Sequence, residues 1–195
     1  MNEQRTRIVV GMTGASGQIY GITLVKALHD LEIETHLVIS PAAKRNLLHE
    51  FDAETVKQLE QQVDVVHHFH DIGASLASGS FQYRGMVIAP CSINTMSALA
   101  TGRSDNLITR AGDVTLKERR RLILLVREEP LHAIHLRNML RLAEAGAIIF
   151  PAMTTFYIKP KTIQDIVDHT VGRILDLLGI ENQLHEEWQG DLPHP

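Results

Sequence analysis

The sequence predicts an α/β fold: a single domain in three α/β/α layers around a parallel sheet, of the Rossmann-like or flavodoxin-like kind. Short runs rich in β-branched residues alternate with longer segments whose apolar residues recur every three to four positions, which is typical of βαβ units. The chain has 195 residues, 44% of them hydrophobic, enough for one sizeable core. We therefore expect one domain over 1–195, with a core at about 7–180 and a peripheral tail at 181–195.

Six segments fit strands because each is a short apolar run bounded by polar or glycine-containing stretches. They are residues 7–12, 35–39, 63–68, 86–89, 122–126 and 147–150. Helices are expected between them, and the segment 131–146, which ends at a glycine, is one of the clearer examples.

The last predicted helix has both a start signal and a stop signal. Thr162 and Asp165 have the spacing of a capping box, and Gly179 supplies the stop. Between them an apolar stripe predicts a buried face. The stripe contains Ile163, Ile166, Val167, Val171, Ile174, Leu175 and Leu178.

Composition argues against several classes of function. The net charge of −4 and the 5% aromatic content do not suit a nucleic-acid-binding surface, which needs basic and stacking side chains. Cys91 is the only cysteine, so no internal disulfide is possible. No apolar run is long enough for a signal peptide or a membrane span, so we expect a soluble, cytoplasmic protein without membrane contact.

The ends of the predicted strands carry small hydroxyl residues and glycines. "TGASG" follows the first strand at 13–17, Ser40 follows the second, and "CSINT" follows the fourth at 91–95. Ligands of open parallel sheets bind beyond the carboxyl ends of the strands, and helix N-termini there present N–H groups to phosphate. With Arg127 after the fifth predicted strand, this edge suits a phosphorylated, planar ligand.

A dinucleotide fits these residues poorly. The third glycine of the pattern is displaced to Gly21, and Ser40 stands where an acid would hold the ribose. Tyr157 and Lys161 match the spacing of a catalytic pair, but Pro160 lies between them and would break the helical face that the pair needs. The sequence also lacks the lysine of a P-loop and a GxSxG motif.

Metal chemistry and cysteine chemistry are also disfavoured. The histidines of "HHFH" at 67–70 alternate between faces of an edge-like strand, and those of "HAIH" at 132–135 have no third ligand in the same segment. No histidine stands near Cys91 in the sequence, so we expect a buried structural thiol there and no metal centre.

Several motifs in the same order resemble the flavin prenyltransferase family of the UbiX type, long described as aromatic acid or 3-octaprenyl-4-hydroxybenzoate decarboxylases. The resemblance covers about 8–188. It rests on "GMTGASGQIYG", "SGSF" at 78–81, "PCSINTMS" at 90–97, "NLITRAGDVTLKERR" at 106–120, "VREEPLHAIHLRNM" at 126–139 and "FY" at 156–157.

The resemblance implies an enzyme that joins a dimethylallyl group from dimethylallyl phosphate to N5 and C6 of reduced FMN. FMN would then be a substrate, and the product, prenylated FMN, would be the cofactor of a partner decarboxylase of the UbiD type. The family also implies a homo-oligomer, typically a dodecamer, whose active sites are shared between subunits.

Carried over by motif, the resemblance assigns three groups of residues. Those at FMN are Gly14, Ala15, Ser16, Ser40, Ser92, Ile93, Asn94, Thr95 and Arg127. Catalytic roles fall to Ser16, Glu50, Arg110, Lys117 and Glu128, and dimethylallyl phosphate would be held by Lys117, Tyr157 and Arg173. Fixed cations and donors such as these stabilise a departing phosphate without a metal. Glu128 would orient Lys117 or Arg173, and Ser16 or Glu50 would relay a proton near N5.

The sequence departs from the family pattern at Asn94, Gly112 and Arg121. The segment "PAMTTFY" at 151–157 also replaces a more usual form, which leaves the choice of mono- or diphosphate donor open.

Two alternative functions remain: an FMN-dependent cysteine decarboxylase of the same fold, and a non-enzymatic flavin carrier. Trp188 and the tail after it are candidates for contacts with neighbouring subunits.

Overall fold

The structure is a computed structural model and describes residues 5–190. The chain divides into two compact units, Met1–Met153 and Thr154–Pro195. The first unit contains the sheet, and the second contains the last helix. The single-domain organisation over 1–195 stays a prediction.

A six-stranded parallel sheet forms the centre of the first unit, with the strand order β3-β2-β1-β4-β5-β6. The strands are β1 (Arg7–Met12), β2 (Glu34–Ile39), β3 (Val65–His67), β4 (Gly85–Cys91), β5 (Arg121–Val126) and β6 (Ile148–Pro151). This is the order of the doubly wound dinucleotide-binding folds, and the winding direction reverses between β1 and β4.

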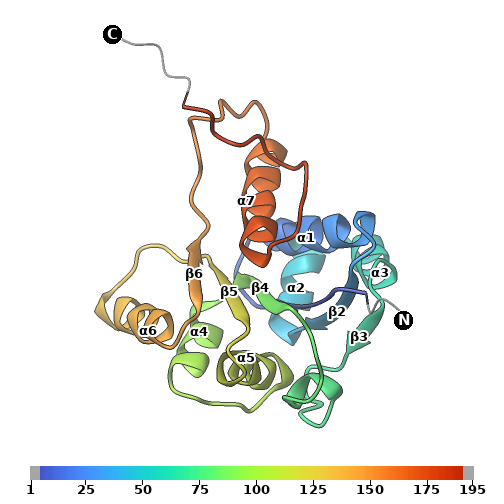
Figure 1. The fold of residues 1–195 in the computed structure, drawn as a ribbon, viewed down its shortest axis with the longest axis vertical. Helices are drawn as coiled ribbons and strands as arrows, with labels where there is room; N and C mark the ends of the chain where they lie inside the picture. The colour runs from blue at the N-terminus through green and yellow to red at the C-terminus, as the bar shows by residue number, and fades with distance from the viewer. Residues whose placement is uncertain (1–4, 191–195) are drawn as a thin grey trace. The chain divides into compact units, whose positions relative to one another are not determined.

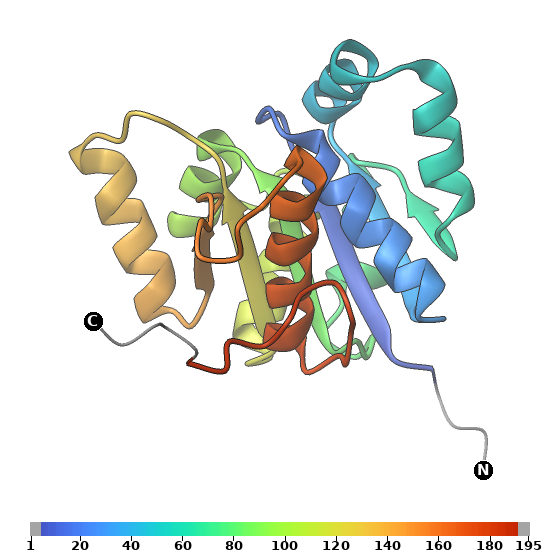
Figure 2. The ribbon, with the colours of Figure 1, turned by 90° about the horizontal axis from the view of Figure 1, so that it is seen from above.

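Helices cover both faces of this sheet. The helices of the first unit are α1 (Gln18–Asp30), α2 (Pro41–Glu50), α3 (Ala53–Gln61), α4 (Ile93–Ala100), α5 (Leu107–Lys117) and α6 (Ala133–Glu144), with a short 3-10 turn at Ser75–Ala77. The first three contact one another on one face, and α4 contacts α5 and α6 on the other (Figure 1). Figure 2 looks onto the face that carries α1. The predicted three-layer fold is therefore confirmed.

The strands are continuous apolar runs because both faces of the sheet are covered. All seven residues of β4 are buried, as are five of the six residues in β1 and in β5. The core between the sheet and α4, α5 and α6 includes Ile88, Leu107 and Leu124. The sheet therefore holds the loops at its carboxyl edge on a rigid base.

The six predicted strands all occur, and β1 has the predicted bounds. β4 is three residues longer than the predicted 86–89, and β3 is three residues shorter than the predicted 63–68. It is an edge strand that pairs only with β2, and the side chains of Val65 and Val66 remain exposed. With a neighbouring strand on one side only, β3 is shorter than its alternating sequence predicted.

The second unit is built on α7 (Ile163–Leu178), whose ends match the prediction. The Thr162 hydroxyl accepts the Asp165 N–H at 3.1 Å, the Asp165 carboxylate accepts the Thr162 N–H at 3.0 Å, and Gly179 ends the helix with φ 68°. The expected stripe is buried except at its start. Ile163, which we expected in the core, is 74% exposed, because it is the first residue of the helix and projects beyond the buried face.

Among residues 5–190, no helix has the length and apolar character needed to cross a membrane.

Candidate functional site

A cavity of about 250 Å³ lies at the carboxyl ends of β1, β2 and β4. Gly14 follows β1, Ser40 follows β2 and Ser92 follows β4, so loops far apart in sequence form one wall. Asn94 and Thr95, from the first turn of α4, also line it. The structure thus brings together five of the residues that the sequence assigned to FMN, at the point where the strand order reverses.

Three helices begin at this cavity. Their N-cap residues, Ser40 of α2, Ser92 of α4 and Asn106 of α5, all line it. The capping side chains accept N–H bonds from Ala43 at 3.1 Å, Thr95 at 3.3 Å and Thr109 at 3.1 Å. Each helix N-terminus carries a partial positive charge. Three of them around one cavity make it suitable for an anion such as phosphate.

Glycine is required at two points near the cavity. A Cβ atom on Gly14 would lie 2.6 Å from the Cβ atom of Ala42, so only glycine allows the loop after β1 to pass the start of α2. A Cβ atom on Gly21 would lie 2.5 Å from the Ala89 carbonyl oxygen, so this glycine lets α1 pack closely on β4. Gly14 therefore shapes the ligand edge, whereas Gly21 serves helix–sheet packing.

Glu50 closes the start of α1. That helix begins at Gly17, which has φ 95° and no side-chain cap of its own. The Glu50 carboxylate accepts the N–H groups of Gly17 at 3.1 Å and of Gln18 at 2.8 Å. Ser16 beside it is exposed, and Ala15 is buried. The predicted pair Ser16 and Glu50 therefore lies at one helix N-terminus, with Glu50 already bonded to the backbone.

Arg127 and Ile93 lie at the ends of β5 and β4. The backbone N–H of Arg127 donates to the Cys91 carbonyl at 3.4 Å, which places it beside the loop that follows β4. Its side-chain Nε atom is buried and has no hydrogen-bond partner within residues 5–190. A buried guanidinium N–H without a partner is costly, so this atom is a candidate ligand donor. Ile93, the first residue of α4, is partly buried against the core.

The sequence analysis missed other residues that line the cavity. They are Pro41, Ala42, Arg45, Phe69, Ala98, Arg103, Asn106 and Thr109. Asn106 carried a usable signal, because it precedes an apolar-periodic segment and has the residue type of an N-cap. Arg45 and Thr109 lie on the early turns of α2 and α5, the helices that begin at the cavity. Phe69 and Arg103 follow β3 and α4, and their positions depend on how those loops fold back, which no local pattern records.

Lys117 and Glu128, both predicted as catalytic, lie at opposite edges of the sheet within one chain. Glu128 comes two residues after β5, at the carboxyl edge. Lys117 ends α5, four residues before β5 begins, and its Nζ atom is close to Gly79, which precedes β4. A six-residue strand spans about 20 Å, so these side chains do not meet in one chain. For Glu128 to orient Lys117, the two residues would have to come from different subunits, so this expectation stays a prediction.

Arg110 lies near the start of α5, the end of the helix whose N-cap lines the carboxyl-edge cavity. Its Nη1 atom donates to Asp113 at 3.0 Å, and its side chain is 37% exposed. Lys117 pairs with Glu118. Both cations thus have carboxylate partners nearby in sequence, Asp113 on α5 and Glu118 directly after it.

Tyr157 and Arg173 lie together in the second unit, where they line a cavity of about 670 Å³. The Tyr157 ring contacts the rings of Trp188 and His169, with centroids 5.2 Å and 5.9 Å apart. Four carboxylates line the same cavity, those of Asp176, Glu181, Glu186 and Glu187. The predicted phosphate-binding pair therefore has acidic surroundings within this unit.

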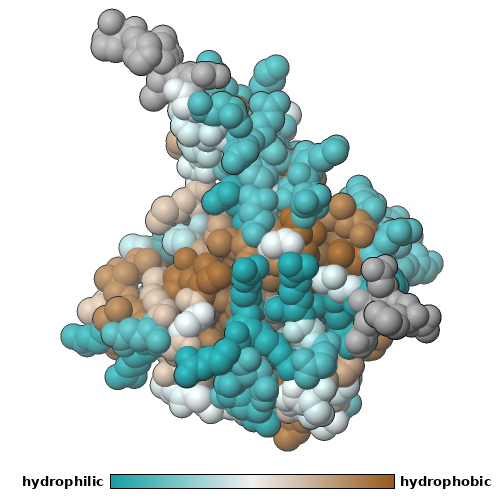
Figure 3. Space-filling model, viewed as in Figure 1, coloured by the Kyte–Doolittle hydropathy of each residue, from teal (hydrophilic) through white to brown (hydrophobic). Residues whose placement is uncertain are grey.

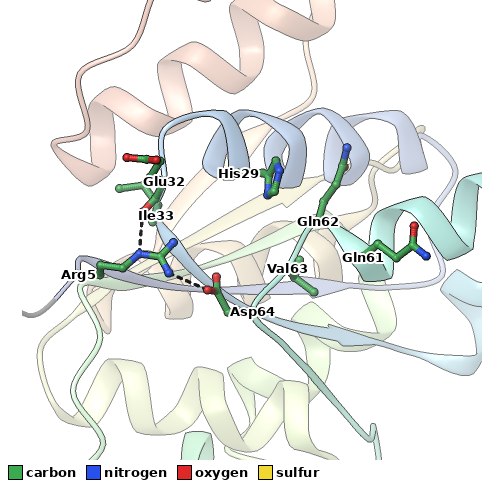
Figure 4. Close-up of a pocket in the computed structure, with 8 residues that line it drawn as sticks. All are labelled: Arg5, His29, Glu32, Ile33, Gln61, Gln62, Val63 and Asp64. Carbon is green, nitrogen blue, oxygen red and sulfur yellow. Dashed lines mark hydrogen bonds and ion pairs between the residues drawn. The ribbon is translucent and has the colours of Figure 1, made fainter.

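A larger cavity of about 720 Å³ lies at the opposite edge of the sheet (Figure 4). It is bordered by the C-terminal ends of α1 and α3, at His29 and Gln61. Its one arginine, Arg5, is already bonded to Asp64 at 2.8 Å and to the Glu32 carbonyl at 3.0 Å. Helix C-termini carry partial negative charge and disfavour anions. Despite its size, this cavity is a poorer candidate than the one at the carboxyl edge.

Cys91 is fully buried, and burial raises the pKa of its thiol to about 12. The expected burial of this thiol is confirmed, and its structural role stays a prediction. Within residues 5–190, no three or more His, Cys, Asp or Glu side chains are grouped to hold a metal ion.

Comparison with known proteins gives a consistent result. The model of the family described as "Flavoprotein" matches residues 1–175. The flavin prenyltransferase UbiX of Thauera aromatica is 48% identical over 185 residues, which cover 95% of each chain.

Two solved structures are similar over nearly the whole chain. The complex of AnUbiX (PadA1) with FMN and dimethylallyl pyrophosphate has a TM-score of 0.92 at 46% identity, covering 96% of this chain and 99% of that one. The dodecameric FMN-dependent UbiX-like decarboxylase of Escherichia coli O157:H7 has a TM-score of 0.90 at 42% identity, covering 95% and 100%.

Proposed function

This chain belongs to the flavoprotein family, and we propose that it is a flavin prenyltransferase, which joins the dimethylallyl group of dimethylallyl phosphate to N5 and C6 of reduced FMN. The observation that carries the proposal is the cavity at the carboxyl edge, where three helix N-termini converge. Two relatives that are 48% and 49% identical to this chain over nearly its full length are described as flavin prenyltransferases.

The residues at this cavity fit FMN. The phosphate of FMN suits the N-termini of α2, α4 and α5, and the buried, unpartnered Nε atom of Arg127 suits an acceptor on the ligand. Gly14 leaves the ligand edge open. We propose that Gly14, Ala15, Ser16, Ser40, Ser92, Ile93, Asn94, Thr95 and Arg127 hold FMN. When bound, reduced FMN supplies the nucleophilic atoms N5 and C6.

The chain's own residues would promote departure of the phosphate. As the C–O bond of dimethylallyl phosphate breaks, the electron pair leaves with the phosphate, and cations near it stabilise the added charge. We assign this role to Arg110, Lys117, Tyr157 and Arg173. Ser16 and Glu50, at the start of α1, would accept or relay the proton that N5 loses.

The proposal includes a homo-oligomer with shared sites. Lys117 and Glu128 come to one site only if two copies supply them, because β5 separates them within a chain. The carboxylates around Arg173 would repel a phosphate dianion, so binding of the dianion requires positive charge in addition to Arg173. Lys117 and Arg110 of a neighbouring copy would provide it.

The outer surface of α6 supports such an assembly. Leu131, Ile134, Leu136 and Leu140 are 40–61% exposed, and Figure 3 shows hydrophobic surface in the region of this helix. An exposed apolar surface of this kind commonly marks a protein interface. The dodecameric relative makes a twelve-subunit assembly our specific expectation, and a UbiD-type decarboxylase remains the proposed user of the product.

One experiment tests the reaction. The protein is incubated without oxygen with reduced FMN and dimethylallyl phosphate, and the flavin is released and analysed by mass spectrometry. A flavin heavier by one dimethylallyl unit supports the proposal. Unmodified flavin, together with decarboxylation of a cysteine-terminated peptide, would indicate the cysteine decarboxylase alternative. Unmodified flavin with neither activity would indicate a carrier.

A further inference from the structure

The Asp176 carboxylate in the second unit contacts three polar side chains. Its Oδ2 atom accepts a hydrogen bond from Arg173 Nη1 at 2.8 Å and lies 3.0 Å from His185 Nε2, and its Oδ1 atom accepts a hydrogen bond from Asn182 Nδ2 at 3.0 Å. Neither the His185 side chain nor that of Asn182 was singled out by the sequence. One carboxylate therefore joins Arg173 to two residues that follow the helix.

The segment after α7 anchors this network. The side chain of His185 is only 10% exposed, and a Cβ atom on Gly172 would lie 2.5 Å from its Nδ1 atom, so the ring packs directly on the glycine. Asn182 also donates to the Gly172 carbonyl at 3.3 Å and accepts the Leu184 N–H at 3.2 Å. The position of Asp176 is thus fixed from the side away from solvent.

Arg173 is the most exposed member of the network. Its side chain is 48% exposed, and Asp176 is its sole hydrogen-bonding partner within residues 5–190. Arginine has five N–H donors, so the bond to Asp176 orients the guanidinium and leaves other donors for a ligand. A long exposed side chain loses conformational entropy on binding an anion unless it is already held in place.

We propose that Asp176, held by His185 and Asn182, is a positioning residue that pre-orients Arg173 for the phosphate of the prenyl donor. The inference rests on the proposed function and deepens it. Asp176 itself touches no substrate. It acts by restricting the orientation of the Arg173 side chain. Asp176 also neutralises part of the arginine charge, but this loss is small because the ion pair is half exposed and screened by solvent.

The test compares Asp176→Asn with Glu181→Gln. Glu181 lines the same cavity and has no hydrogen bond to Arg173, so its variant removes one negative charge without disturbing the network. Asp176→Asn should raise the KM for dimethylallyl phosphate about five- to tenfold, with kcat and FMN affinity nearly unchanged. Glu181→Gln should leave KM the same or lower it.

A double variant separates positioning from general damage. In an Arg173→Ala background, Asp176→Asn should have no further effect on KM, because the residue that it orients is gone. His185→Gln, which keeps a donor, should give a smaller increase than Asp176→Asn. Thermal unfolding of each variant should match the parent within a few degrees.

The outcomes separate the two proposals. A parent protein that makes no prenylated flavin overturns the proposed function and this inference together. An active parent whose Asp176→Asn variant keeps the parental KM, binds dimethylallyl phosphate more tightly, or raises KM equally in the Arg173→Ala background overturns the inference alone.

Discussion

The backbone N–H of Ser92 donates to the hydroxyl of Thr13 at 2.7 Å, and the same hydroxyl donates to the Pro90 carbonyl at 2.7 Å. One side chain at the end of β1 thus satisfies two backbone groups at the end of β4. Thr13 is 2% exposed, so these bonds are made away from solvent. The relationship locks together the two loops on either side of the winding reversal.

Replacing Thr13 with valine should destabilise the protein and weaken FMN binding together. The substitution keeps the shape and leaves the partly buried Ser92 N–H without an acceptor, and a buried donor left unpaired costs about 1–3 kcal/mol. Chemical denaturation and quenching of FMN fluorescence measure the two effects. Thr13→Ser keeps the hydroxyl and should lose less than half as much stability. Equal losses in both variants would mean that the hydroxyl is not the link.

Replacing Gly14 with alanine should push the loop after β1 away from α2. The new Cβ atom would lie 2.6 Å from Ala42 Cβ, a contact that neither backbone relieves easily, and overpacking of this kind costs about 1–3 kcal/mol. FMN affinity should fall with it. The matched rescue is Gly14→Ala combined with Ala42→Gly, compared with Ala42→Gly alone. If the double variant binds FMN no better than Gly14→Ala, the clash with Ala42 is not the cause.

Cys91 should be unreactive in the folded protein. Burial raises the pKa of its thiol to about 12, so the nucleophilic thiolate is scarce at neutral pH. Labelling with a thiol reagent should therefore be slow in the native protein and fast in denaturant. Cys91→Ala should retain prenyl transfer. Rapid labelling of the native protein accompanied by loss of turnover would assign the thiol a chemical role.

Acid should destabilise the sheet edge at His67. Burial and the neighbouring His36, whose Nδ1 atom is 2.8 Å from His67 Nε2, lower the pKa of His67 below its ordinary 6.5, although Asp71 opposes the shift. Between 6.5 and this lower native pKa the unfolded chain binds more protons, so the free energy of unfolding falls as pH falls. His67→Gln keeps a donor for His36 and removes the titration.

The measurement is urea denaturation between pH 7 and about 5.5, above the range in which carboxylates titrate. Glu34, which contacts His36 at 3.0 Å, has a pKa lowered mainly by its hydrogen bond to Arg7, so its own effect comes at lower pH. The variant should show a flatter dependence than the parent. An unchanged slope would assign the acid sensitivity to other groups.

Mixed oligomers should reveal a shared active site. Lys117→Ala and Glu128→Gln should each be nearly inactive. If one site takes Lys117 from one copy and Glu128 from another, co-expression of the two variants restores about a quarter of the sites, since half of each contributor is intact. Prenylated flavin formed per subunit measures this. Two variants that stay inactive when co-assembled would place both residues in a single chain's site.

The sequence was sufficient for features that depend on neighbours along the chain. Thr162, Asp165 and Gly179 define both ends of α7 through local hydrogen bonds and a left-handed glycine. The exposure of Ile163 was not predictable from periodicity, because the first turn of a helix has no preceding turn to bury it.

Part of the candidate site depends on tertiary structure. Gly14, Ser40 and Ser92 could be placed together because parallel strands end at one edge. Phe69 and Arg103 could not, since their positions depend on how the loops after β3 and α4 return to that edge. The separation of Lys117 from Glu128 could have been predicted from the sequence, because one predicted strand lies between them and the length of a strand follows from its number of residues.

That separation by β5 has a kinetic consequence. If the reaction needs Lys117 from one copy and Glu128 from another, an isolated chain holds only half of a site. Turnover per chain then falls on dilution, once the assembly dissociates. If FMN binds at the three helix N-termini, as we propose, one copy supplies that cavity and flavin binding would persist. At low abundance the protein would then be a flavin reservoir, and it would begin to consume prenyl phosphate only after its own accumulation.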